Sequence, residues 1–263
     1  MRSTLETPGG APDFEVVEFF PKRTKYCVCV TVLNEGDRLR NQLNRMKDRA
    51  GLADIIIADG RSSDDSTAPE FLKESGTRAL LMTSEPGLST ATRMGMAYAM
   101  AQGYEGMITI DGNGKDGVEA LPDFIRELDH GYDLVQGSRF LKGGRHKNTP
   151  WDRYLGIRLV MAPLLGLTCG FHYTDPTDAF RAMSRRFLCD PRVQPLRPIF
   201  VRFSLQHYVI YRAAKLGFKV KEIPVTRVYP EDGSVPTKIH GLRLKLVDLL
   251  ELIAAVSGRY DPR

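Results

Sequence analysis

The stretch Met-Ile-Thr-Ile-Asp-Gly-Asn-Gly-Lys-Asp, from Met107 to Asp116, indicates both how this sequence folds and where its chemistry lies. Its first four residues are apolar or β-branched and predict a short buried strand. The residues that follow are all polar or glycine. Asp111 at the end of the strand, with Asn113 two residues later, can offer two oxygens to one hard cation such as Mg²⁺ or Mn²⁺. A polar turn without a metal uses the same residue types, so both interpretations stay open at this point.

Two oxygen ligands are too few to enclose such a cation. A site this sparse completes its octahedron with water and with substrate phosphates. We therefore expect a substrate that carries a diphosphate.

Short apolar runs alternate with segments of helical period on both sides of this strand. We expect strands at residues 26–33, 54–58, 78–82, 106–110 and 133–136, and helices at residues 37–49, 63–73, 89–101 and 119–129. Alternation of this kind predicts an α/β fold with a mostly parallel sheet covered by helices on both faces. Ligands of such sheets bind at the carboxyl ends of the strands.

The expected strand ends are rich in polar residues and glycine. They carry Leu33-Asn34-Glu35, the run from Ala58 to Ser66, the turn at Gly87, and Asp111. Acids paired with glycines at three strand ends exceed what turns alone require. No Gly-x-Gly-x-x-Gly follows the first strand, and neither a Gly-Lys-Ser/Thr loop nor a Gly-x-Ser-x-Gly elbow occurs. These absences argue against a dehydrogenase, a P-loop enzyme and an α/β-hydrolase.

The second half of the chain is less regular. Residues 151–167 and 202–216 have helical periodicity, and residues 219–228 predict a strand that is broken at Pro224. Asp175 precedes Pro176, which fits a helix N-cap as well as it fits a catalytic acid. The segment from Ile239 to Ala255 predicts an amphipathic helix with basic residues near its start. Such a helix packs on its own domain or lies on an anionic membrane surface.

Length and composition fit one folded unit of 263 residues. We divide it into an arm (1–24), a main domain (25–238) and a C-terminal helix with its tail (239–263). The sequence has no apolar run of about 18 residues and no signal-peptide pattern, so we expect a cytoplasmic protein, with its four cysteines reduced and packed. The net charge of +5 suits anionic partners. Aromatic and basic residues do not interleave, so no nucleic acid is expected.

Five motifs, in order along residues 25–230, together resemble those of the family 2 glycosyltransferases. These enzymes have the GT-A fold, with a Rossmann-like sheet, and the match is closest to the branch of dolichyl- and polyprenyl-phosphate sugar synthases. The motifs are Thr31 to Glu35, Ile57 to Asp64, Asp111-Gly112-Asn113, Asp133 to Phe140 with its Gly-Ser-Arg, and Asp175 to Arg185.

The sequence departs from the family pattern at four positions. In the nucleotide loop, Ala58 replaces the first acid and Arg61 replaces a serine. Asn113 replaces the second acid of the metal motif, and Ala179 replaces the glycine before Phe180. The change at Asn113 removes one formal charge from the shell of the cation, which weakens its binding unless Asp116 or substrate phosphates compensate.

The resemblance implies transfer of a sugar, with inversion, from a nucleoside diphosphate sugar to a lipid phosphate, a glycan or a small molecule. It assigns the Mg²⁺ or Mn²⁺ ion to Asp111 and Asn113. It makes Asp175 or Asp178 the general base for an alcohol acceptor, whereas a phosphate acceptor needs no base. It also implies Arg181 as a catalytic residue and assigns the donor to Leu33, Asn34, Glu35, Asp59, Arg61, Gly87, Arg93, Asp111, Gly112, Arg139, Arg227 and Lys238.

Two other functions share parts of this pattern. A nucleotidyltransferase would place a glycine-rich basic loop directly after the first strand, where this sequence has Asn34-Glu35-Gly36-Asp37. A glycosyltransferase-like protein that has lost activity and binds a sugar nucleotide or a partner protein is the alternative, favoured by Ala58 and Asn113. Peripheral membrane contact through the C-terminal helix and a homo-oligomer are both compatible with the sequence.

Overall fold

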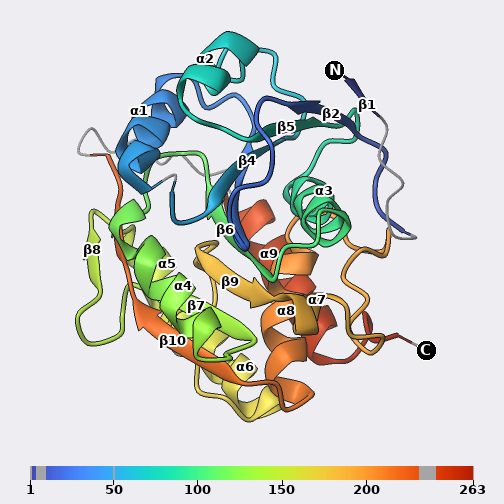
Figure 1. Cartoon of the computed structure of the whole chain (residues 1–263). Helices are drawn as coiled ribbons and strands as arrows, with labels where there is room; N and C mark the ends of the chain where they lie inside the picture. Colours follow the sequence, from blue (N-terminus) through green and yellow to red (C-terminus); the bar gives the residue numbers. More distant parts are fainter. Residues whose placement is uncertain (1, 4–9, 50, 231–240, 263) are drawn as a thin grey trace.

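The structure is a computed structural model that describes residues 2–3, 10–49, 51–230 and 241–262 (Figure 1). Its strands are β1 (Arg2–Ser3), β2 (Glu15–Glu18), β3 (Tyr26–Val32), β4 (Asp54–Asp59), β5 (Ala79–Met82), β6 (Gly106–Asp111), β7 (Leu134–Ser138), β8 (Arg145–Lys147), β9 (Arg181–Ser184), β10 (Val220–Pro224) and β11 (Thr226–Val228). Its helices are α1 (Asp37–Met46), α2 (Pro69–Glu74), α3 (Leu88–Ala101), α4 (Leu121–Asp129), α5 (Trp151–Gly156), α6 (Ala162–Cys169), α7 (Arg185–Leu188), α8 (Ser204–Lys215) and α9 (Gly241–Val256). Two short 3₁₀ helices, η1 (Lys47–Arg49) and η2 (Val118–Ala120), lie directly after α1 and before α4. A π-helical segment, η3 (Ile157–Met161), joins α5 to α6.

In the part of the chain that the structure describes, one large sheet has the strand order β1-β2-β5-β4-β3-β6-β9-β7-β10. Its centre, β5-β4-β3-β6, is parallel, as is the pair β7 and β10. Antiparallel pairings of β2 with β5 and of β9 with β6 and β7 surround this centre. The predicted parallel centre is therefore confirmed, and its carboxyl ends bring residues 31–33, 59–60 and 111–113 to one edge.

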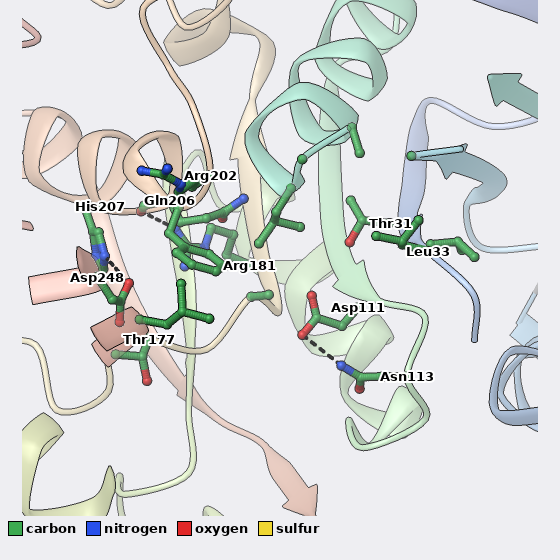
Figure 2. Close-up of a pocket in the computed structure, with 18 of the residues that line it drawn as sticks. Thr31, Leu33, Asp111, Asn113, Thr177, Arg181, Arg202, Gln206, His207 and Asp248 are labelled. Carbon is green, nitrogen blue, oxygen red and sulfur yellow. Dashed lines mark hydrogen bonds and ion pairs between the residues drawn. The ribbon is translucent and has the colours of Figure 1, made fainter. Parts of the chain in front are cut away.

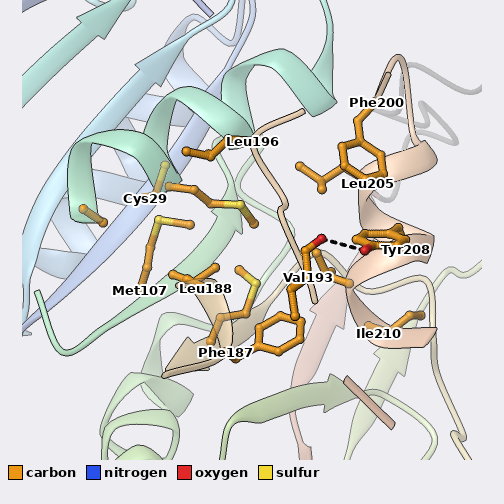
Figure 3. Packing of buried hydrophobic residues seen from close by; sticks show 14 of the residues in the cluster. Cys29, Met107, Phe187, Leu188, Val193, Leu196, Phe200, Leu205, Tyr208 and Ile210 are labelled. Carbon is orange, nitrogen blue, oxygen red and sulfur yellow. Dashed lines mark hydrogen bonds between the residues drawn. The ribbon is translucent and has the colours of Figure 1, made fainter. Parts of the chain in front are cut away.

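Two apolar clusters cover the two faces of the sheet, because successive residues of a strand point to opposite sides. Cys27 and Cys29 of β3 join the cluster beneath α3, α8 and α9, whereas Val28 and Val30 join the cluster beneath α1, α2 and α4. Figure 3 shows the first cluster, where Met107 of β6 packs near Phe187 and Leu188 and the hydroxyl of Tyr208 donates to the carbonyl of Val193 at 2.6 Å. Helices on both faces were expected and are confirmed.

Several predicted boundaries change in the structure. The helix expected at residues 63–73 begins only at Pro69, because the residues before it form a loop that binds Asp59 and Asn34, through Thr67 and Ser63 respectively. Strand β9 was not predicted, because its Arg-Ala-Met-Ser sequence is too short to show alternation. The strand expected at residues 219–228 does break near Pro224, and its two parts join different sheets, β10 beside β7 and β11 beside β8.

The cysteine prediction holds in part. All four thiols are free, and three are buried, but Cys189 is exposed at the end of α7. The prediction that all four cysteines are packed is therefore wrong for Cys189.

The N-terminal arm contributes β1 and β2, which extend the sheet beyond β5. The C-terminal helix α9 packs on the domain through Leu252 and Ala255, while Leu246, Leu250 and Ile253 stay exposed. Ile239 and His240, the expected start of this helix, lie outside the described residues. Within the described ranges, every helix is too short or too polar to traverse a bilayer.

Candidate active site

A cavity of about 340 Å³ lies where β3, β4 and β6 end (Figure 2). One of its ends is formed by Thr31, Leu33, Asp111 and Asn113, and the other by Thr177, Arg202, His207 and Asp248. Seven residues predicted from the sequence line it, namely Leu33, Glu35, Gly87, Asp111, Asn113, Arg181 and Arg227.

Asp111 ends β6 directly beside Thr31 of β3. Its Oδ2 accepts from Nδ2 of Asn113 at 3.2 Å and from Nη2 of Arg227 at 3.2 Å. Burial opposes ionisation of Asp111, but the charges of Arg227 and Lys115 outweigh it and lower the pKa of this carboxyl. Asp111 is therefore an anion at neutral pH.

Gly112 serves packing at this strand end. A Cβ on it would stand 3.0 Å from a methyl of Val32 and 3.1 Å from the carbonyl oxygen of Thr31. Its backbone nitrogen donates to that same carbonyl at 2.9 Å. Because a side chain at residue 112 would push β6 away from β3, the glycine keeps Asp111 at the floor of the cavity.

Arg227, on β11, lies between two buried acids, Asp116 and Asp178, and the partly exposed Asp111. Its Nη1 lies 2.6 Å from Oδ1 of Asp116 and 3.1 Å from Oδ1 of Asp178, in addition to the contact with Asp111. These acids raise the pKa of Arg227 well above its ordinary value, although burial opposes this. The guanidinium thus carries a fixed positive charge next to the strand end where a diphosphate was predicted.

Two neighbours of Arg227 have strongly shifted ionisation. Burial raises the pKa of Asp116 to about 7, with the charge of Arg227 opposing the shift and that of Asp178 adding to it. Burial and the charge of Arg227 lower the pKa of Lys115 to about 7. The net charge at the floor of the cavity therefore depends on burial as well as on which ionisable residues lie there.

The oxygen donors fit a hard cation. No cluster of three or more His, Cys, Asp or Glu suitable for a metal occurs in the described ranges. Asp111 and Asn113 would therefore supply one carboxylate and one amide oxygen, and phosphates and water the remainder. The amide nitrogen of Asn113 faces Asp111, so its amide must turn over to present the oxygen.

The loop after β4 is fastened to the end of β3. Asp59 accepts from the backbone nitrogen of Ser62 at 2.8 Å and from Oγ1 of Thr67 at 3.1 Å. Oδ1 of Asn34 accepts from the backbone nitrogen of Ser63 at 2.7 Å. Asp59 and Asn34 therefore hold the loop in place, and neither lines the cavity. Arg61, within this loop, is exposed and has a φ of 76°.

Asp175 is not a helix N-cap, because residues 175–178 form a turn and no helix follows Pro176. Its carboxylate binds Arg139 through two contacts, Nε to Oδ2 at 2.6 Å and Nη2 to Oδ1 at 2.9 Å. The N-cap interpretation was wrong because the long-range partner at residue 139 cannot be read from local sequence. Asp178 is equally buried, and neither acid lines the cavity.

Three predicted arginines have buried guanidinium groups. Arg181 lines the cavity, donates to the carbonyls of Gln206 and Asp178 at 2.7 Å each, and has a pKa that burial lowers to about 10. Arg139 is held by Asp175 outside the lining. Arg93 donates to the carbonyls of Leu196 and Gly10, and the structure does not bring it to the cavity. Lys238 lies outside the described residues.

Sequence reasoning missed four polar residues at the far end of the cavity, Arg153, Arg202, His207 and Asp248. Nε2 of His207 lies 2.8 Å from Oδ1 of Asp248, which joins α8 to α9. Arg153, His207 and Asp248 belong to helices far apart in the sequence, and Arg202 lies in the turn before α8, so none of them follows a strand end. The one local signal was the basic character of Arg153 and Arg202 at the starts of the two expected helices.

A second cavity, of about 360 Å³, lies between the α5–η3 segment and α9. Its walls include Ile157, Val160, Met161, Leu246 and Leu249. It shares Arg153, Thr177 and Asp248 with the first cavity, so the two adjoin. The chamber at the strand ends thus adjoins a groove between helices, where apolar side chains such as Val160, Met161 and Leu249 stand beside Asp152 and Lys245.

Comparison with known proteins agrees with this arrangement. The sequence model of the Glycosyl transferase family 2 matches residues 27–189. The chain is 28% identical over 241 residues to the polyprenol monophosphomannose synthase of Mycolicibacterium smegmatis, covering 89% of this chain and 88% of that protein. It is 27% identical over 213 residues to the undecaprenyl-phosphate mannosyltransferase of Micrococcus luteus, covering 78% and 84%.

A solved structure shares the fold. The glucosyl-3-phosphoglycerate synthase of Mycobacterium tuberculosis, in complex with Mn²⁺, UDP and phosphoglyceric acid, superposes with a TM-score of 0.66 at 16% identity. The superposition covers 92% of this chain and 80% of that one.

Proposed function

The chain belongs to the glycosyl transferase family 2 and is a glycosyltransferase, and we propose that it moves a sugar from a nucleoside diphosphate sugar to a polyprenyl-type lipid phosphate. The names of the two relatives support mannose as the sugar. The fold supports this proposal by placing the cavity at the strand ends, where nucleotides bind in open parallel sheets.

The adjoining cavities carry the proposal. An acceptor with a phosphate head and an isoprenoid tail needs cationic side chains for the head, such as Arg153 and Arg202, and apolar walls for the tail. The chamber ends at Arg153, Thr177 and Asp248, and the groove lined by Val160, Met161 and Leu249 begins at these same residues.

The donor diphosphate belongs at the strand-end side of the chamber. Leu33, Glu35 and Gly60 line the wall where the nucleoside would lie, and Asp111 lies at the floor. As the sugar leaves, negative charge develops on the diphosphate, and Arg227 is the buried cation positioned to offset it. A divalent ion held by Asp111 and Asn113 would add positive charge there when bound.

The acceptor phosphate belongs at the other end, near Arg153 and Arg202. A phosphate is already anionic, so its oxygen attacks the anomeric carbon without a general base. We assign Asp175 and Asp178 to positioning instead, because they hold Arg139 and Arg227. Attack from the face opposite the leaving diphosphate inverts the anomeric centre.

A panel assay tests this function. The purified chain is incubated with GDP-, UDP-, CDP- and dTDP-sugars, with and without Mn²⁺ or Mg²⁺, and with a short polyprenyl phosphate, the matching polyprenol or a free sugar. We expect a glycosylated lipid phosphate with one donor class, detected by mass spectrometry. Product on the polyprenol or the free sugar would contradict the proposed acceptor, and nucleotide binding without any transfer would favour the inactive alternative.

A further inference from the structure

Exposed apolar side chains gather on two helical segments. Nine of the thirteen large apolar residues that are exposed in the described ranges belong to the continuous helix of α5, η3 and α6 or to α9. We call them the apolar face: Trp151, Tyr154, Leu155, Leu159, Val160, Leu167, Leu246, Leu250 and Ile253. Trp151 is 75% exposed and Leu167 is 87% exposed. Such a concentration on a folded protein marks an interaction surface.

The two segments adjoin. Lys245 of α9 makes an ion pair with Asp152 of α5, and both segments line the groove. Their inner sides already pack in the core, through Ile157 and Leu165 on one segment and Leu252 on the other. The apolar face is therefore not needed to fill the core, and two of its members, Val160 and Leu246, also line the groove.

The charges around this face favour an anionic partner. Asp152 is bound by Lys245 and Asp248 by His207, while Glu251 accepts from the backbone nitrogen of Phe203 at 2.9 Å. Arg158 of η3 and Arg243 of α9 are exposed on the same two segments, and the guanidinium of Arg158 lies 5.9 Å from the ring centroid of Phe140. Apolar residues bordered by exposed cations bind the surface of a bilayer that contains anionic lipid.

We propose that the apolar face docks onto an anionic lipid bilayer, with the groove between α5–η3 and α9 opening toward the acyl chains. This inference rests on the proposed function, because it supplies the route by which an isoprenoid tail reaches the chamber without crossing water. The helices lie along the interface. Trp151, Leu159 and Leu250 enter the region between headgroups and acyl chains, and Arg158 and Arg243 meet the lipid phosphates.

Trp151 makes a direct test available, since it is the single tryptophan of the sequence. Adding vesicles of phosphatidylcholine with phosphatidylglycerol to the unmodified protein should shift its tryptophan emission to shorter wavelength, and vesicles of phosphatidylcholine alone should shift it much less. High salt should weaken the response, because it screens the contacts with lipid phosphates. An unchanged emission with both vesicle types would overturn the proposal.

Variants make the test specific. Leu159→Glu and Leu250→Glu lie on the face but outside both cavity linings, and each should lower vesicle binding by about tenfold in co-sedimentation. Leu52→Glu is the matched control, because Leu52 is also exposed but lies before β4. Equal binding by all three variants and the parent protein would overturn the docking surface.

Two further measurements separate this inference from the proposed function and from self-association. Transfer to a short polyprenyl phosphate in detergent should be unchanged by Leu159→Glu and Leu250→Glu, because no bilayer is present. Absence of transfer in the parent protein under these conditions would contradict the proposed function and not the docking. Light scattering gives the oligomeric state. Variants that turn a dimer into a monomer and leave vesicle binding intact would identify the face as a contact between copies, which would overturn the proposal.

Discussion

The two ends of the site are built in opposite ways. At the strand ends, buried charges fix one another, with Arg227 held by Asp111, Asp116 and Asp178. At the other end, an apolar groove lies between two helices whose outer sides are exposed. The first end suits a diphosphate, because the charges of that ligand occupy fixed positions. The second end suits an apolar chain, which can vary in length and conformation. Substitutions at the strand ends should therefore impair transfer and stability, whereas substitutions in the groove should impair acceptor binding.

The largest effect is expected at Asp111. Asp111→Asn removes the carboxylate that faces Arg227 and that would hold the cation, so transfer should fall by about 10²–10³-fold. Steady-state kinetics with the donor identified by the panel checks this. Asp37→Asn, an exposed acid at the start of α1, is the matched control and should keep full activity. A small loss with Asp111→Asn would place the diphosphate elsewhere.

Arg227→Met should damage stability as well as transfer. It leaves the buried Asp116 and Asp178 without the cation that they share, which costs about 3–5 kcal/mol of unfolding free energy. Chemical denaturation measures the loss, with Arg145→Met on the neighbouring strand β8 as an exposed control. Mn²⁺ should restore stability to this variant more than to the parent protein. Equal stabilisation of the two would mean that the ion and Arg227 do not share these acids.

Val160→Glu tests the groove end. A charge among the groove's apolar walls should raise KM for a polyprenyl phosphate by about tenfold, with kcat and donor affinity nearly unchanged. Leu159→Glu, one residue away and outside the lining, controls for charge and helix position in a detergent assay. Loss of donor binding with Val160→Glu would contradict the separation of the two ends.

The smallest change is expected from Asn113→Asp. A second carboxylate beside Asp111 should tighten Mn²⁺ binding about tenfold in the presence of the nucleoside diphosphate. Calorimetric titration of Mn²⁺ into the protein saturated with nucleotide measures it. An unchanged affinity would show that the cation is held by other groups.

The sequence predicted which residues meet at the strand ends because the signals for them are local. Each predicted strand ends in its own polar residues, and parallel strands bring those ends together, so Leu33, Glu35, Asp111 and Asn113 could be grouped from the sequence alone. Arg93 shows the limit of that reasoning. It follows the turn at Gly87 in sequence, but its guanidinium binds the carbonyls of Leu196 and Gly10.

The groove end could not be predicted in the same way. His207 and Asp248 lie forty-one residues apart and meet only because α9 packs on α8. The amphipathic C-terminal helix was foreseen, but not that Leu246 and Leu250 would remain exposed beside a second exposed helix. Which apolar residues a helix buries depends on its neighbours in space, and the local pattern does not specify those neighbours.

The claim that the chamber and the groove act as one site is tested most directly by acceptor length. With the unmodified protein in detergent, kcat/KM is measured for isoprenoid phosphates of increasing chain length at a fixed donor concentration. The account predicts that kcat/KM rises with each added isoprene unit until the groove is filled, since each unit buries further apolar surface. A kcat/KM that is independent of chain length would contradict it.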